Sequence, residues 1–346
     1  MISLLTKRRP LLYACLIMML AIITAAEVFL GPVSLSPNDM INVIFGEGEP
    51  GATAVLLHIR LPRLVLGLAV GTSLALSGCA LQGVLRNPLA DPGLIGMTAG
   101  ASVGAISVIV LGNYFVGDLP TSIRPYAMPI GAFFGGATVT GLIFSLSRRS
   151  GETNVAMLIL AGIAINAIAA AAIGAMVYIS DDQQLRDLTF WSMGSIGSGT
   201  WLSIIVTTSI TMSAGIALLK LGRPLDLFQL GERAAFHAGL DIERKKLQIA
   251  LMTALAVGSV TATAGPIGFI GLVAPHMARI IAGPLHRHVL PVAALLGSVL
   301  ILSADLAVRV VAPPTEPPIG LATSLIGGPF FLWLLITRFR AGNLHA

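Results

Sequence analysis

Charged residues are scarce in this chain of 346 residues: only 11% are Asp, Glu, Lys or Arg, whereas 55% are hydrophobic. Soluble domains carry about 25% charged residues, so a soluble fold of this size would have too few charges to cover its surface. The apolar residues form continuous runs of about 18–25 residues, long enough to cross a bilayer as helices. The composition therefore excludes a soluble globular protein and predicts an all-α polytopic membrane protein.

Motifs that carry chemistry are also missing. The two cysteines, Cys15 and Cys79, both lie inside apolar runs, so neither a disulfide framework nor a metal cluster is indicated. The chain contains no Gly-Lys pair, which excludes a P-loop for ATP, and no His-Glu-x-x-His, Cys-x-x-Cys or Gly-x-Ser-x-Gly motif. The sequence therefore predicts no catalytic residues and no bound metal.

Ionisable residues are almost missing from the apolar runs themselves. Glu27 and Asp305 are the main carboxylates within them, and both lie toward an end of a run. A carrier driven by protons or sodium ions usually needs ionisable groups or an evident ion site inside the membrane. Their scarcity favours a passive conduit driven by another protein. A stand-alone secondary transporter remains the alternative.

Ten hydrophobic segments are present that we expect to span the membrane. The segment at 268–282 is short and is expected to be a partial or broken span. The first segment follows a basic start, as in a signal peptide, but it is long enough to span and further spans follow, so we expect it to be retained. The ten segments lie at about 11–30, 63–84, 93–112, 126–146, 154–178, 198–219, 247–265, 268–282, 289–311 and 319–337.

The distribution of basic residues supports this count. With ten spans and an internal N-terminus, 16 of the 21 Lys and Arg residues fall on the inside. Such an asymmetry is what the positive-inside rule requires, so both termini are predicted to be cytoplasmic. The residues predicted outside are Arg60, Arg63, Arg124, Arg186 and Arg309.

An internal echo suggests an inverted repeat within one transmembrane domain, 1–346. Residues 68–78 read "LAVGTSLALSG" and residues 255–265 read "LAVGSVTATAG". They lie in the second and seventh spans, which cross in opposite directions, and inverted repeats recur in transporters. The predicted halves are about 1–195 and 196–346. Chance similarity of two Ala/Gly-rich helices is the alternative.

Glycines recur four residues apart in several runs, as in the pair Gly100 and Gly104 and the pair Gly131 and Gly135. This spacing places a smooth stripe on one helix face, so we predict close helix–helix approach there.

Three segments between the spans have recognisable patterns. "SPNDMINVIFG" and "SDDQQLRDLTFWS" predict short interfacial helices capped by Ser36 and Ser180. The longest internal loop, 220–246, contains apolar residues at helical spacing, which predicts a short amphipathic helix that lies on lipid or docks into a protein partner.

The turn "RNPLADPG" lies at the cytoplasmic mouth between the second and third spans. Pro88 and Pro92 stop helix continuation, and Asn87 and Asp91 can satisfy the backbone groups that this frees. The turn either projects Leu89 into a pore as a plug or is a plain connection between helices.

The segments "IRLPRLVLGLAVG…LSGCALQGVLRNPLADPGLIG" and "GPIGFIGLVAPHMAR…SADLAVRVVAPPTEPPIGLATSLIGGPFFLWLL" resemble the FecCD family over nearly the whole chain. These proteins are permease subunits of ABC importers for iron-siderophores, vitamin B12 and haem. "DDQQLRDLTFWSMGS" and "GGPFFLWLL" are most similar to the haem-importing branch.

The resemblance implies a type II ABC importer fold in the bacterial inner membrane. It implies a homodimer of ten-span subunits, two ATPase subunits that hydrolyse ATP-Mg on the cytoplasmic face, and a periplasmic substrate-binding protein. The implied cargo is haem, with a ferric siderophore or cobalamin as the alternative.

The resemblance also assigns roles to matching residues. Residues 148–157, "RRSGETNVAM", occupy a second gate position but lack the Ser-Thr-Ser of the B12 permease, which leaves individual gate residues there unassigned. The implied roles are binding-protein docking for Arg60, Arg63 and Arg309; the cytoplasmic gate for Asn87 and Leu89; the ATPase coupling helix for Leu230, Gly231, Glu232, Ala235, Gly239 and Leu240; and pathway lining for Asn166, Ala172 and Met176.

Overall fold

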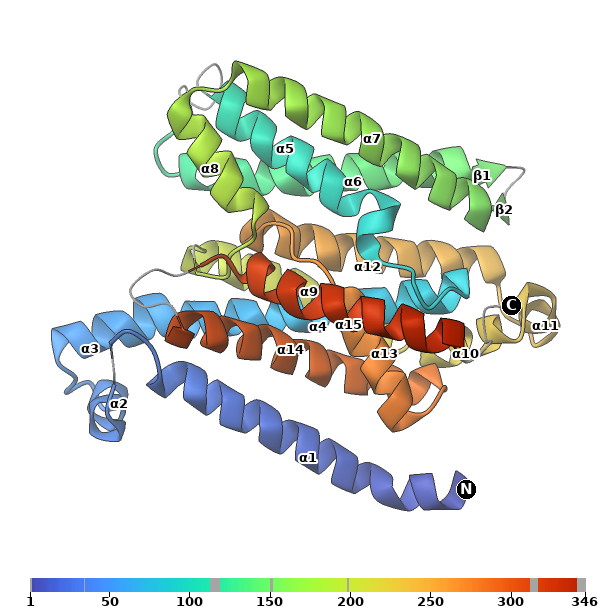
Figure 1. Ribbon diagram of the computed structural model, residues 1–346, viewed down its shortest axis with the longest axis horizontal. Coiled ribbons are helices and arrows are strands. Elements are labelled where there is room, and N and C mark those ends of the chain that lie inside the picture. The colour runs from blue at the N-terminus through green and yellow to red at the C-terminus, as the bar shows by residue number, and fades with distance from the viewer. Residues whose placement is uncertain are drawn as a thin grey trace.

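The computed structural model describes residues 2–33, 35–112, 119–149, 152–197, 199–311 and 317–340, and nearly all of them are helical (Figure 1). The longer helices run roughly along one common direction and form a bundle. They are α1 (Ile2–Phe29), α4 (Leu61–Leu85), α5 (Met97–Leu111), α6 (Ala127–Ser147), α7 (Val155–Ile179), α9 (Trp201–Leu219), α12 (Ile242–Ala264), α13 (Ile270–Ala282), α14 (His286–Val311) and α15 (Ile319–Arg340).

Short elements connect these helices at the two ends of the bundle. They are α2 (Pro37–Ile44), α3 (Pro50–Ala54), the π-helix η1 (Val55–Arg60), the 3-10 helices η2 (Pro92–Ile95) and η4 (Arg124–Tyr126), the two-residue strands β1 (Arg148–Arg149) and β2 (Glu152–Thr153), α8 (Asp182–Ser192), α10 (Gly222–Gln229) and α11 (Glu232–His237). The strands pair antiparallel and join α6 to α7.

The predicted membrane fold is confirmed. Within the described residues, seven helical segments are long and apolar enough to cross a membrane, and three shorter apolar helices accompany them. These three are α5, α13 and the apolar part of α15. Each of the ten predicted spans corresponds to one of these helices. The short segment after "AGPIGF" is α13, which has only 13 residues, as expected of a partial span.

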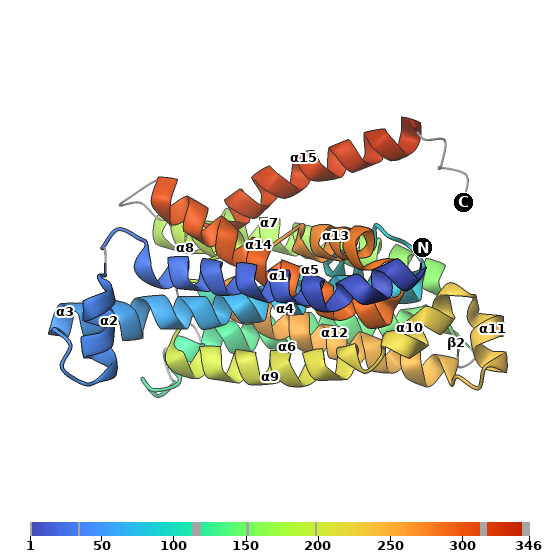
Figure 2. The same cartoon turned by 90° about the horizontal axis from the view of Figure 1, so that it is seen from below.

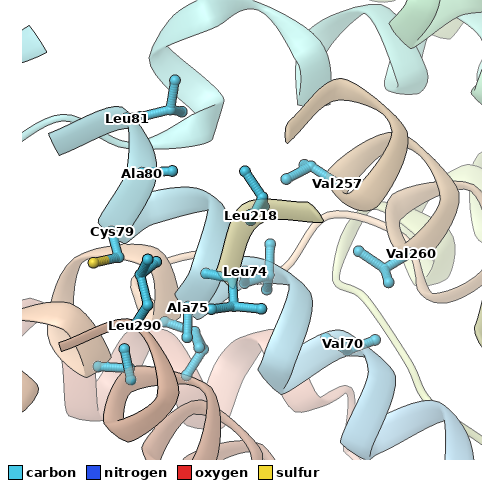
Figure 3. Close-up of a cluster of buried hydrophobic side chains, with 14 of the residues drawn as sticks. Val70, Leu74, Ala75, Cys79, Ala80, Leu81, Leu218, Val257, Val260 and Leu290 are labelled. Atoms are coloured by element: carbon cyan, nitrogen blue, oxygen red, sulfur yellow. The ribbon is translucent and has the colours of Figure 1, made fainter. Parts of the chain in front are cut away.

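Helix α4 lies at the centre of the bundle and is buried along most of its length. Val70, Leu74 and Cys79 of α4 belong to the main apolar core together with Leu218 of α9 and Leu290 of α14 (Figure 3). Helix α12 also packs on α4, so the two echoing segments 68–78 and 255–265 lie in neighbouring helices. The division into inverted halves remains a prediction.

Glycines allow the closest contacts between helices, as their spacing predicts. A Cβ on Gly71 of α4 would lie 2.4 Å from the carbonyl oxygen of Gly297 of α14. A Cβ on Gly104 of α5 would lie 2.0 Å from the carbonyl oxygen of Gly131 of α6. Since backbone meets backbone at these points, no larger side chain fits unless the helices separate.

The two ends of the bundle carry different segments (Figures 1 and 2). The start of α1, the end of α15, α10, α11 and the β1–β2 hairpin lie at one end. Helices α2, α3 and α8 lie at the other end. This arrangement agrees with an even number of crossings.

Two predictions about the short helices need correction. The cap of α8 is Asp181 and not Ser180, because Asp181 and Gln184 form a reciprocal capping box. The amphipathic segment in loop 220–246 is two helices, because the backbone turns at Gly231 with a positive φ of 98°. The predicted helix α2 is confirmed, with Ser36 as its cap.

Candidate functional site

The three arginines assigned to docking lie together where α1 ends and α4 begins, and all three are buried, with at most 6% exposure. Arg63 donates from Nε to Oδ2 of Asp305 at 2.8 Å and from Nη2 to Oδ1 at 2.7 Å. Arg309 donates from Nη1 to Oε2 of Glu27 at 2.7 Å and also lies 3.6 Å from Asp305. We call Glu27, Arg60, Arg63, Asp305 and Arg309 the arginine cluster.

The arginine cluster also holds the backbone that follows α1. Arg60 donates to the carbonyl oxygens of Val28 and Val33, and Arg309 donates to that of Leu30. Buried guanidinium groups need such acceptors, because an unpaired charge in a low-dielectric interior is costly. The segment between α1 and α2 is therefore fastened to η1 and α14.

The sequence does not predict this burial. From the sequence we expect the three arginines to be exposed, where their charges can contact a partner protein. Asp305 precedes Arg309 by one helical turn and faces Arg63, so both guanidinium groups are directed into the protein. The three arginines lie at the same end of the bundle as α2 and α3, and the position of this end outside the membrane stays a prediction. The docking role itself stays a prediction.

The proposed gate turn caps itself, as its sequence predicts. The Asn87 side-chain oxygen accepts from the backbone N–H of Leu89 at 2.9 Å, and the Asp91 carboxylate accepts from that of Gly93 at 2.8 Å. Burial raises the pKa of the Asp91 carboxyl above its ordinary value, an effect that the Gly93 N–H partly opposes. Leu89 is half-buried.

Gln82, near the end of α4, fastens this turn to α13. Its Nε2 donates to the carbonyl oxygens of Ala90 at 3.3 Å and Gly271 at 3.1 Å. Its Oε1 accepts from Arg279 at 2.6 Å. The gate turn is thus connected to a helix nearly 200 residues further along the chain. Nothing in the sequence indicates this role, because Gln82 has the pattern of a polar residue near the end of a span.

The predicted coupling segment lies at the end of the bundle where α1 starts (Figure 2). Leu230 is exposed between α10 and α11, Ala235 is fully buried, and Leu240 packs against the main core. Gly231 and Gly239 both adopt positive φ and bracket α11. Glu232 is the first residue of α11 and remains partly exposed.

A contact from the coupling segment reaches the gate turn. Gln229, the last residue of α10, donates from Nε2 to the carbonyl oxygen of Gly83 at 2.9 Å. Gly83 precedes Asn87 by one helical turn, so α10 is joined to the stretch that leads into the gate turn.

The residues assigned to the pathway lie on α7, but two of them contact other elements of the same chain. Asn166 donates to the carbonyl oxygen of Gly93 at 3.3 Å, and Met176 Sδ accepts from the hydroxyl of Ser107 at 3.6 Å. Ala172 is half-buried. The open face of α7 instead presents residues such as Ile168 and Tyr178, which is 90% exposed. The lining role stays a prediction for all three.

Within the described ranges, no group of three or more His, Cys, Asp or Glu side chains is placed to hold a metal ion. The polar contacts instead fasten loops at both ends of an apolar helical bundle. Such an arrangement is typical of a membrane transport protein whose crossings are fixed and whose ends meet other proteins.

The chain belongs to the FecCD transport family, whose model matches residues 17–337. It is therefore a permease subunit of the ABC importer type. It is 42% identical over 328 residues to the hemin transport system permease protein HmuU of Yersinia pestis, covering 95% of this chain and 96% of that protein.

Two further comparisons agree with this assignment. The chain is 36% identical over 293 residues to the cobalamin import system permease protein BtuC of Halobacterium salinarum, covering 84% of this chain and 76% of that protein. The fold is similar to a solved inward-facing ABC transporter described as of the metal-chelate type. The TM-score is 0.83 at 30% identity, over 95% of this chain and 99% of that one.

Proposed function

We propose that this chain is the permease subunit of an ATP-driven importer that moves haem from the periplasm to the cytoplasm. The observation that carries the choice of cargo is the 42% identity to a hemin permease over 95% of this chain, against 36% over 84% for a cobalamin permease. Cobalamin and ferric siderophores are the alternative cargoes.

The working unit in this proposal is a homodimer in the bacterial inner membrane, with both termini cytoplasmic. Two ATPase subunits bind at the α10 and α11 end and hydrolyse ATP-Mg, and a periplasmic binding protein delivers the cargo at the α2 and α3 end. The apolar surface of α15 supports the dimer. In Figure 2 this helix leans away from the bundle, and it exposes Leu325 and Trp333, which are 75% and 58% exposed.

In this proposal the chain works by alternating access. Movement of the ATPase subunits displaces α11, and the gate turn at Asn87 and Leu89 opens or closes the path on the two-fold axis. The residues proposed to line this path remain Asn166, Ala172 and Met176. None of their side chains carries a charge, which suits a large cargo with apolar faces.

The arginine cluster contributes to docking in this proposal by fixing the backbone beneath the binding protein. Replacing Arg60 by methionine (R60M) removes its bonds to Val28 and Val33 while leaving the Arg63–Asp305 and Arg309–Glu27 pairs. We expect the affinity for the binding protein to fall about tenfold. This factor corresponds to the free energy of roughly one hydrogen bond to a charged group, which no longer orders the backbone of the docking surface. ATPase assembly should stay unchanged. Capture of the binding protein on immobilised R60M checks this, and undiminished capture would refute the assignment.

The cargo is tested by uptake into proteoliposomes that contain the permease, its ATPase and its binding protein. We expect ATP-dependent accumulation of haem and little accumulation of cobalamin or ferric hydroxamate supplied at the same concentration. Preferred uptake of either competitor would replace haem as the cargo. Uptake that continues without ATPase and binding protein would instead establish a secondary transporter.

A further inference from the structure

Lys246 is buried near the start of α12, although it belongs to the charged run "RKK". Its side chain is 4% exposed. The ammonium group lies 3.0 Å from Oε1 of Glu232, 3.2 Å from Oε1 of Glu243 and 3.2 Å from the carbonyl oxygen of Thr153. The contacts with Glu243 and Thr153 are hydrogen bonds, and the contact with Glu232 is an ion pair. The burial of this charge is therefore fully compensated.

Thr153 is held to α12 by all of its polar atoms. Its backbone N–H and its hydroxyl donate to Oε2 of Glu243 at 3.0 and 2.8 Å, and its carbonyl oxygen accepts from Lys246. Thr153 belongs to β2 and pairs with Arg148 of β1. Since Asn154 caps α7 directly after it, the hairpin cannot leave α12 without pulling the start of α7.

The third partner of Lys246 lies on a different segment. Glu232 opens α11 directly after the turn at Gly231, and its side chain is 44% exposed. Phe236, one turn further on, is 65% exposed, so α11 offers a surface to a protein on this side. Lys246 thus contacts the exposed helix and the hairpin at the same time.

We propose that Lys246 is a positioning residue that couples displacement of α11 to the β1–β2 hairpin and the start of α7. This inference rests on the proposed importer function, because it requires an ATPase that moves α11. The coupling has a physical basis. The ammonium group is buried and is bonded to Glu243 and Thr153, so a displacement of Glu232, its partly exposed ion-pair partner on α11, is passed to both of them.

The two contacts from this end of the chain reach different targets. Gln229 joins α10 to the stretch before the gate turn, and Lys246 joins α11 to the hairpin. Each loop thereby has its own link, so loss of Lys246 should disconnect α11 from the hairpin and leave the gate turn attached. The hairpin itself stays bonded to Glu243 of α12.

The test compares Lys246→Met with Lys245→Met in the permease–ATPase complex. Methionine keeps the length of the side chain and removes the charge. Lys245 is a matched control, because its recorded side-chain bond is to Gln248 on its own helix. In K246M we expect the cargo imported per ATP hydrolysed to fall about tenfold, with ATP hydrolysis retained, as for loss of a typical coupling free energy. K245M should match the wild type.

A second readout does not depend on the cargo. Cysteine is placed at the exposed hairpin residue Arg148 (R148C) in a background without Cys15 and Cys79, and its labelling rate is measured with and without ATP. We expect a nucleotide-dependent change in the wild type and in K246R, which keeps the charge, but no change in K246M. If wild-type complexes fail to import haem, the cargo proposal fails and this labelling arm still decides the coupling.

The coupling proposal is overturned if K246M keeps the nucleotide-dependent labelling, or if import and ATP hydrolysis fall in equal proportion. Should K246M yield too little folded protein, Glu243→Gln replaces it. This variant removes the charge that Lys246 and Thr153 share, and it is expected to abolish the labelling change in the same way.

Discussion

Replacing Asp305 by alanine (D305A) is expected to destabilise the folded protein by about 3–5 kcal/mol, because it leaves a buried guanidinium without its carboxylate. Asp305 is 1% exposed and accepts both hydrogen bonds of the bidentate pair with Arg63. Arg309 keeps Glu27 as a partner, so the loss falls mainly on Arg63. The measurement is the unfolding free energy, or the apparent midpoint of thermal unfolding in detergent.

Two further variants separate this cause from a general effect of mutation. Asp187→Ala removes an exposed carboxylate on α8 and should change the midpoint little. The double variant R63M/D305L replaces both charges by apolar groups and should recover most of the loss, since a buried pair contributes little over apolar residues of similar volume. A single D305A variant as stable as D187A would contradict the account of the arginine cluster.

Replacing Gly104 by valine (G104V) is expected to prevent α5 and α6 from packing, at a cost of about 3 kcal/mol or more. The added Cβ would lie 2.0 Å from the carbonyl oxygen of Gly131, and a backbone atom cannot turn aside as a flexible side chain can. The fraction of protein that is monodisperse after extraction into detergent, and its unfolding midpoint, measure the effect.

Gly141 of α6 offers the matched control. Nothing lies within 4 Å of a Cβ built there, so G141V adds the same isopropyl group in open space. We expect it to extract and unfold like the wild type. Equal loss in both variants would mean that valine disturbs these helices through its helix propensity and not through the contact.

The apolar spans could be predicted because membrane burial acts on each run of residues separately. Helix α2 and the gate turn were also predictable, since Ser36, Asn87 and Asp91 act on backbone groups within three residues of themselves. The prediction for the cap of α8 is wrong by one position because Ser180 and Asp181 are both good caps. Only the reciprocal bonds decide between them: the Gln184 N–H donates to the Asp181 carboxylate, and the Gln184 side-chain oxygen accepts from the Asp181 N–H.

The arginine cluster could not be predicted, because it depends on pairs distant in the sequence. Arg63 and Asp305 are 242 positions apart, and nothing local to either one indicates the other. The division of the amphipathic segment into two helices at Gly231 could not be predicted for another reason. The spacing of apolar residues continues across Gly231, and this spacing carries no information on the backbone angle φ.

The sequence does contain a sign that Lys246 is buried and paired. Ile242, Ile249 and Thr253 share its face of the helix at offsets of four, three and seven residues, and the latter two are fully buried. A lysine on an apolar helix face implies a buried partner, because its ammonium group is too costly to leave unpaired. Which carboxylates serve it depends on tertiary packing.

The self-satisfied turn at Asn87 and Asp91 has a consequence for the speed of opening. Because the side chains of Asn87 and Asp91 accept hydrogen bonds from backbone N–H groups of the same turn, the turn can move as a rigid unit without breaking these bonds. The turn is still held to other helices by Gln82, which bonds to Gly271 and Arg279 of α13, and by Asn166 of α7, which donates to the carbonyl oxygen of Gly93. If this turn is the cytoplasmic gate that we propose, release of these two amide side chains sets the rate at which it opens.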